Sequence, residues 1–265
     1  MSKKASRRTF LKVISAAVLL IAGVALLVFI NYHPFGYRIS VGVHGFSQAA
    51  PNVYFNNGYS HDKEEALAII TEARERVEGF FGEVSSNPVI IICDDEHALK
   101  KMGGATTAMS IAIFRVHSYI LISPQWLNVD ILAHEISHAE VFNIVYNGKI
   151  RKPDLIPTWF DEGVALLNDY REEYGEEAWI KATNNGQDTI SLDDIDTPDK
   201  FFTIEDSEKL KLHYIVSGHE VRNWIEKNGI EALFDLLKKV NHGNKFRELY
   251  FQALFNCFQC INIGR

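Results

Sequence analysis

Residues 127–146, LNVDILAHEISHAEVFNIVY, contain the motif HEISH at 134–138. The apolar residues of this segment and the Asn-Gly pair that follows predict one long helix over this range. Side chains four residues apart share a helical face, so His134 and His138 can bind one metal ion. Glu135 is rotated by about 100° from His134, where its carboxylate can accept a proton from metal-activated water. Two histidines and a glutamate in so apolar a helix would be costly unless they were liganded or hydrogen-bonded.

A second segment, PTWFDEGVA at 157–165, supplies a candidate third ligand, which catalytic zinc usually needs. It resembles the segment of gluzincin metallopeptidases in which a Glu on a second helix completes the metal site. Its W-F-x-E-G-x-A pattern is similar to that of aminopeptidase N-like enzymes and related bacterial peptidases. The resemblance spans about residues 88–240 and implies a zincin-like fold, Zn²⁺ as cofactor and a peptide or protein substrate. It also implies Glu162 as the third ligand, 24 positions after His138, with Asp161 as its rival.

The same resemblance implies two further parts of the site. Gluzincins pair the extended substrate backbone with an edge strand near the metal, and Met109–Phe114 is the candidate strand. An oxyanion donor often comes from a helix after the third ligand, which here points to the segment LHYIVS at 212–217. Within it, Tyr214 is preferred to His213 as the catalytic donor, although a tyrosine packed between helices gives the same pattern.

The order of the predicted elements favours the α+β class. Candidate strands, including one at residues 37–46, are concentrated before residue 125, and helices follow, including one at residues 158–170. We therefore expect a zincin-like catalytic lobe with an N-terminal mixed sheet at residues 37–170 and a helical lobe at residues 171–265.

The N-terminus predicts a targeting segment or an anchor. Lys3, Lys4, Arg7, Arg8 and Lys12 are five of the 27 basic residues, whereas all 34 acidic residues follow residue 30. Residues 31–265 thus carry a formal charge of −12, from 22 basic and 34 acidic residues, which argues against a nucleic-acid partner. The uncharged residues 13–30 would span roughly 27 Å as a helix, close to the thickness of the bilayer core. The basic flank at residues 1–12 would stay cytoplasmic and leave the remaining chain outside.

The segment SRRTFLK at residues 6–12 resembles the twin-arginine export signal of bacteria and archaea. The apolar run after it is longer than in most such signals, and the one small-x-small sequence, Gly23-Val24-Ala25, lies inside it. An uncleaved anchor is therefore favoured over a removed signal. This predicts a single-pass protein of the bacterial cytoplasmic membrane, N-terminus inside, with an extracytoplasmic catalytic domain.

Together these features predict a membrane-anchored zinc metallopeptidase with His134, His138 and Glu162 as ligands and Glu135 as base. Two alternatives stay open: a non-catalytic scaffold or assembly protein that keeps the fold, and a hydrolase of cell-wall amides. An intact Glu135 disfavours the scaffold, since a fold retained without hydrolysis would tolerate loss of the base. Cys257 and Cys260 are surrounded by apolar residues and are interpreted as core positions rather than a metal site, with oxidation of the pair in an exported chain as the alternative.

Overall fold

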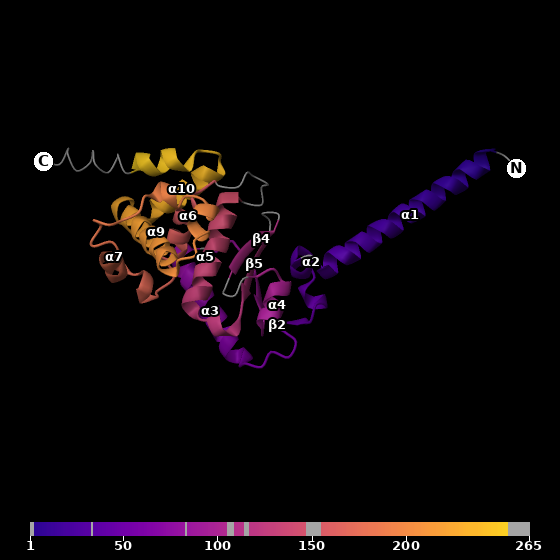
Figure 1. Ribbon diagram of the computed structural model, residues 1–265, viewed down its shortest axis with the longest axis horizontal. Coiled ribbons are helices and arrows are strands. Elements are labelled where there is room, and N and C mark those ends of the chain that lie inside the picture. The colour runs from indigo at the N-terminus through magenta and orange to yellow at the C-terminus, as the bar shows by residue number, and fades with distance from the viewer. Residues whose placement is uncertain are drawn as a thin grey trace.

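The computed structural model describes residues 3–32, 34–82, 84–104, 109–113, 117–146 and 155–253. It confirms the α+β class: an N-terminal apolar helix comes first, then a mixed sheet, then a largely helical region (Figure 1). In chain order the elements are α1 (Lys3–Tyr32), α2 (Pro34–Ile39), η1 (Val41–Val43), β1 (Phe46–Ala50), β2 (Val53–Asn56), α3 (Lys63–Phe81), β3 (Val89–Ile92), α4 (Glu96–Lys101), β4 (Met109–Ile113), β5 (His117–Ile122), η2 (Pro124–Trp126), α5 (Val129–Tyr146), α6 (Thr158–Ala165), η3 (Glu172–Tyr174), α7 (Glu176–Ala182), η4 (Leu192–Asp194), α8 (Pro198–Phe202), α9 (Ser207–Asn228) and α10 (Ile230–Asn241). A last helical stretch covers residues 246–253.

The five described strands form one sheet in the order β1-β2-β3-β5-β4. The inner pairs β2–β3 and β3–β5 are parallel, and the outer pairs β1–β2 and β4–β5 are antiparallel. The strand predicted at Met109–Phe114 is β4, and it lies at the edge of the sheet. Phe114 itself is outside the described residues.

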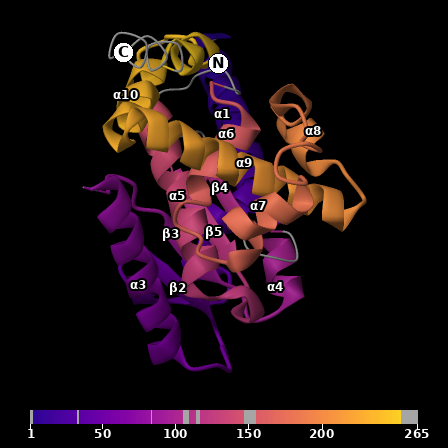
Figure 2. The same ribbon diagram turned by 90° about the vertical axis from the view of Figure 1, so that its left-hand side faces the viewer.

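Alternating side chains of the apolar strand β3 build a core on each face of the sheet. Ile90 and Ile92 pack with residues of α3 and α5, whereas Ile91 and Cys93 pack with residues of η1 and α4. Figure 2 accordingly shows α3 and α4 on opposite sides of the sheet. Cys93 is fully buried, as a core position requires.

The helices after residue 157 share a separate core with the C-terminal half of α5. Its largest fully buried side chains are aromatic, among them Phe160 of α6, Phe201 of α8 and Trp224 of α9. Because α5 contributes to this core and to the sheet core, one helix joins the two halves of the domain. The HEISH motif at 134–138 lies on that shared helix.

The strand predicted at residues 37–46 is wrong. That region holds the end of α2 and the single turn η1, and β1 begins only at Phe46. Pro34 opens α2, a position that suits its fixed φ and missing N–H. Gly45 then turns the chain with φ 82°, a conformation that favours glycine. The alternation of Ile39, Val41 and Val43 therefore reflects short helical turns, in which only Val41 is buried.

The helix predicted at residues 158–170 is too long, because α6 ends at Ala165. Three residues later the Asn168 side chain donates to Ser137 Oγ at 2.9 Å, and the Asn168 carbonyl accepts from Arg76 at 3.0 Å. These long-range bonds hold the chain in a non-helical course, which Asn and Asp adopt readily.

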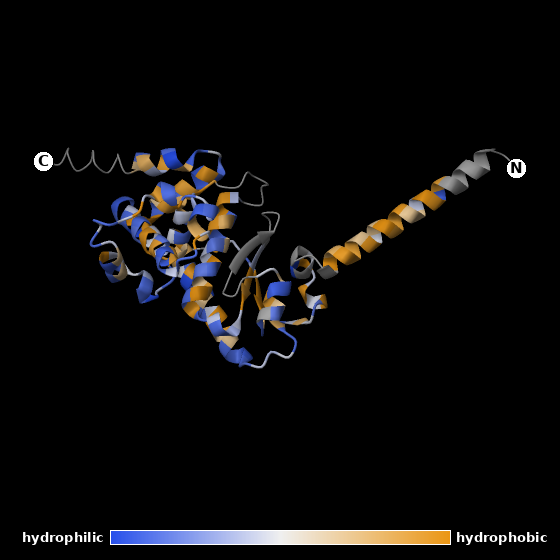
Figure 3. Cartoon of the chain, in the orientation of Figure 1, coloured by the Kyte–Doolittle hydropathy of each residue, from blue (hydrophilic) through white to orange (hydrophobic). Residues whose placement is uncertain are grey.

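Helix α1 extends away from the rest of the molecule (Figure 1), and its apolar part stands out in the hydropathy colouring of Figure 3. Residues Leu11–Ile30 are long and apolar enough to cross a membrane, and none of them is buried in the structure. The segment could be a membrane anchor or a signal sequence.

A glycine fixes how closely α6 approaches α9. A Cβ added to Gly163 would lie 2.5 Å from the Ser217 carbonyl oxygen and 2.5 Å from Val221 Cγ2. We expect Gly163→Ala to destabilise the fold by about 1–3 kcal/mol through overpacking, measured by thermal or denaturant unfolding. Gly79→Ala in α3 is the control, because its Cβ would meet nothing within 4 Å. Equal stability of the two variants would contradict the close packing of α6 on α9.

Candidate metal centre

Helix α5 places the two motif histidines on one buried face. Both imidazoles project toward the helical half, and their ring centroids lie 4.7 Å apart at an interplanar angle of 80°. The Nε2 atoms of His134 and His138 face each other at 3.1 Å. This is the arrangement that their four-residue spacing predicts.

Helix α6 brings the buried carboxylate of Glu162 to the same point. Glu162 Oε2 lies 3.3 Å from His134 Nε2 and 3.4 Å from His138 Nε2. Ligands held tetrahedrally at zinc–nitrogen distances of 2.0–2.1 Å would be about 3.3–3.4 Å apart. Among the described residues, His134, His138 and Glu162 form a group that could hold a metal ion. The sequence singled out the same three side chains.

The orphaned carboxylate oxygen supports a cation at this point. Glu162 Oε2 is buried and has no hydrogen-bond partner, although two ring nitrogens lie nearby. If both imidazoles carry their proton on Nδ1, the lone pairs of the two Nε2 atoms and of Glu162 Oε2 point toward one another with no proton between them. Such a cluster is electrostatically costly unless a cation occupies its centre. The donor set, two nitrogens and one oxygen, suits zinc.

A proton competes with a cation for this site. Burial lowers the pKa of His138, but the carboxylates of Asp161 and Glu162 outweigh burial and hold this pKa well above its ordinary value. Burial conversely raises the pKa of Glu162, and the two imidazoles overcome it and lower this pKa. A metal must therefore displace a proton, so acid conditions weaken metal binding.

Two further carboxylates lie behind the imidazoles, on the sides away from Glu162. Asp161 Oδ2 is 3.1 Å from His138 Nδ1, and Asp169 Oδ2 is 3.6 Å from His134 Nδ1. Asp161, the rival ligand, thus faces the outer nitrogen of His138 rather than the point where the three inner atoms meet. A carboxylate in the position of Asp161 commonly fixes the tautomer and orientation of a metal-binding imidazole. Asp169 lies beyond hydrogen-bond distance, and His134 Nδ1 has no hydrogen-bond partner among the described residues.

Sequence reasoning missed Asp169 and the contacts that hold it. The Asp169 side chain is fully buried, and the Arg171 guanidinium binds both its oxygens. Asn168 donates to Ser137 on α5, so the turn after α6 is fastened to the helix that carries the histidines. The available signal was a polar Asn-Asp pair directly after the apolar residues 164–167.

The two predicted catalytic residues lie beside His134, His138 and Glu162, which we call the triad. Glu135 is buried on α5, and the Tyr214 ring on α9 lies 6.5 Å from the His134 ring between their centroids. Burial raises the pKa of Tyr214, and Glu162, Tyr174 and Glu135 raise this pKa further, so the hydroxyl stays protonated. His213, the other candidate, faces away from this group, since its Nδ1 lies 2.9 Å from the Phe201 carbonyl oxygen.

The edge strand β4 runs close to α5, the helix that carries both histidines. No described strand pairs with its outer edge. Residues 114–116, which follow β4, and Cys257 and Cys260 are outside the described residues.

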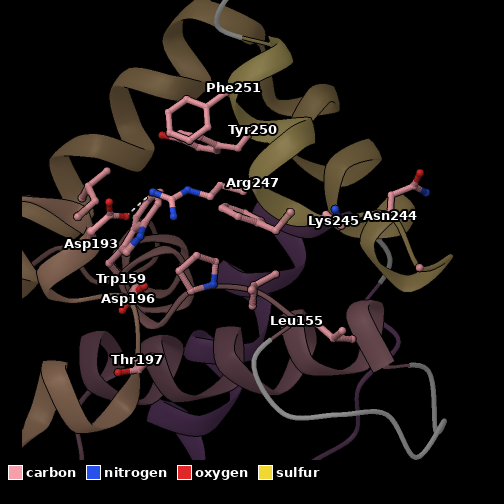
Figure 4. Close-up of a pocket in the computed structure, with 15 residues that line it drawn as sticks. Leu155, Trp159, Asp193, Asp196, Thr197, Asn244, Lys245, Arg247, Tyr250 and Phe251 are labelled. Carbon is pink, nitrogen blue, oxygen red and sulfur yellow. Dashed lines mark hydrogen bonds and ion pairs between the residues drawn. The ribbon is translucent and has the colours of Figure 1, made fainter.

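A separate cavity of about 410 Å³ opens between the start of α6, η4 and the helical stretch at residues 246–253 (Figure 4). Its wall includes Trp159, Tyr250 and Phe251, with the Asp193–Arg247 ion pair at its rim. None of the triad residues lines this cavity, so it is distinct from the candidate metal centre.

Comparison of the chain with known protein families, with curated proteins and with solved structures finds no match.

Proposed function

We propose that this protein is a zinc-dependent peptidase held at a membrane by α1. The observation that carries the proposal is the spacing of three buried acceptor atoms. The two Nε2 atoms and Glu162 Oε2 are 3.1–3.4 Å apart, close to the edges of a tetrahedron around zinc. Such a set leaves one position open for water or substrate, and Glu135 follows His134 directly on the same helix.

In this proposal, bound zinc would act as a Lewis acid that lowers the pKa of water and polarises the scissile carbonyl. Glu135 would accept the proton of the attacking water and return it to the leaving amine. The Tyr214 hydroxyl would donate a hydrogen bond to the developing oxyanion, a role supported by its raised pKa. Asp161 would keep the His138 imidazole oriented. By resemblance to gluzincins, β4 would pair with the extended substrate backbone.

Metal analysis combined with digestion of a peptide library tests this function. We expect about one zinc per chain and cleaved peptides whose formation stops with a chelator and resumes when zinc is restored. Bound zinc without cleavage of any peptide, but with cleavage of cell-wall amides, would favour the alternative hydrolase. Bound zinc with neither activity would favour a scaffold.

Tyr214→Phe removes only the proposed oxyanion donor. We expect kcat to fall by about 10–10³-fold, with zinc content and fold unchanged. Steady-state kinetics on a peptide that the wild type cleaves give the measurement. A kcat equal to that of the wild type would remove Tyr214 from the mechanism.

The membrane part of the proposal predicts one crossing, with the N-terminus cytoplasmic and the segment retained. The apolar length of Leu11–Ile30 and the basic residues before it support this expectation. Mass analysis of the mature N-terminus is the measurement. A new terminus between residues 25 and 40 would identify the segment as a removed signal.

A further inference from the structure

The short helices α2 and η1 lie between α1 and the sheet half of the domain in the order of the chain. A Cβ on Gly36 would lie 2.3 Å from the Phe29 carbonyl oxygen, so α2 packs directly on the last turns of α1. On its other side, the largely buried Arg38 donates from Nη2 to the Gly103 carbonyl at 3.2 Å, just after α4. The end of α1 and the domain therefore contact the same small helix.

The surface next to this connection is apolar and exposed. Ile39 is 56% exposed and Val43 is 79% exposed, the largest exposure among the large apolar side chains of the described residues. Both follow the apolar span closely in sequence. In Figure 1, α2 lies at the end of the domain where α1 joins, and α7 lies at the opposite end. We call Ile39 and Val43, together with Lys101 at the end of the neighbouring helix α4, the juxtamembrane face.

The charge of this region differs from that of the rest of the domain. Residues 31–61 contain no Asp or Glu, although residues 31–265 as a whole carry a formal charge of −12. Lys101, in the last turn of α4, lines a groove of about 260 Å³ together with His44 and Asp95. Exposed apolar side chains beside a lysine and a segment without acids suit a surface of anionic lipid headgroups.

We propose that the juxtamembrane face rests on the lipid surface of the membrane that α1 enters. Ile39 and Val43 lie among the headgroups, and Lys101 faces anionic lipid phosphates. The packing at Gly36 and the Arg38–Gly103 hydrogen bond then hold the metal centre at a fixed height above the bilayer. This inference rests on the proposed anchoring by α1, and it does not depend on the peptidase activity.

The test uses the full chain in lipid nanodiscs of mixed anionic and zwitterionic lipid, with and without bromine on the acyl chains. Val43→Trp places a fluorescent probe on the juxtamembrane face, and Ile180→Trp places one on α7, where Ile180 is also exposed. We expect brominated lipid to quench most of the emission that Val43→Trp adds and none of the emission that Ile180→Trp adds. Equal quenching at the two positions would overturn the proposal.

Two controls separate the parts of the inference. Failure of the chain to co-elute with nanodiscs overturns the anchoring and the lipid contact together, whereas co-elution without quenching at residue 43 overturns the lipid contact alone. Lys101→Gln in the Val43→Trp chain should reduce quenching in anionic nanodiscs and leave it unchanged in purely zwitterionic ones. Unchanged quenching in both lipids would overturn the role of Lys101.

Discussion

Glu135→Gln is expected to abolish hydrolysis and to leave zinc bound. The amide is nearly isosteric with the carboxylate, so α5 and the three ligands should survive the change. It cannot accept the proton of the attacking water, and general-base catalysis contributes typically about 10²–10⁴-fold. Turnover of a peptide substrate should fall by that factor or more, while zinc per chain equals that of the wild type.

The comparison with Glu140→Gln controls for loss of a buried acid on the same helix. Glu140 accepts hydrogen bonds from Ser85 and Ser86 at the start of the segment leading to β3, away from the proposed proton transfer. That variant should be less stable to unfolding, but its turnover of the peptide substrate should stay close to that of the wild type. Near-full turnover by Glu135→Gln would show that the base, and with it the reaction class, is assigned wrongly.

His138→Ala is expected to remove most of the metal. The change deletes one of three acceptor atoms, and alanine is well tolerated within a helix. Loss of a residue that hydrogen-bonds a metal ligand already lowers metal affinity by about 10–100-fold, so loss of the ligand itself should lower it further. Zinc per chain after dialysis, with circular dichroism to verify folding, gives the measurement.

His242→Ala is the matched control, because His242 is exposed at the end of α10 and its ring lies against the Lys238 carbonyl. It should retain the zinc content of the wild type. Stoichiometric zinc in His138→Ala would refute the assignment of the ligands.

Local geometry explains why so much of the candidate site could be predicted. The four-residue spacing of His134 and His138 fixes their common face as soon as α5 forms, whatever the rest of the chain does. Glu162 needed the resemblance of its segment to gluzincins, because its approach to α5 depends on the packing of α6 against α9. The α+β class followed from the order of strands and helices along the chain.

The errors arose where distant contacts decide the local structure. Asp169 reaches the back of His134 only because α6 stops at Ala165, and hydrogen bonds of Asn168 to α5 and to Arg76 accompany that stop. Neither contact is visible in the local pattern, which continued the helix to residue 170. The alternation of Ile39, Val41 and Val43 likewise suggested a strand, although Pro34 and the packing of Gly36 on α1 favour helical turns.

The most direct test of the metal centre is anomalous diffraction at the zinc edge from crystals of the zinc-loaded chain. We predict one anomalous peak about 2.0–2.2 Å from His134 Nε2, His138 Nε2 and a carboxylate oxygen of Glu162. A peak elsewhere, such as one held by Asp161, or no peak between these three atoms in zinc-loaded crystals, would contradict the proposed centre.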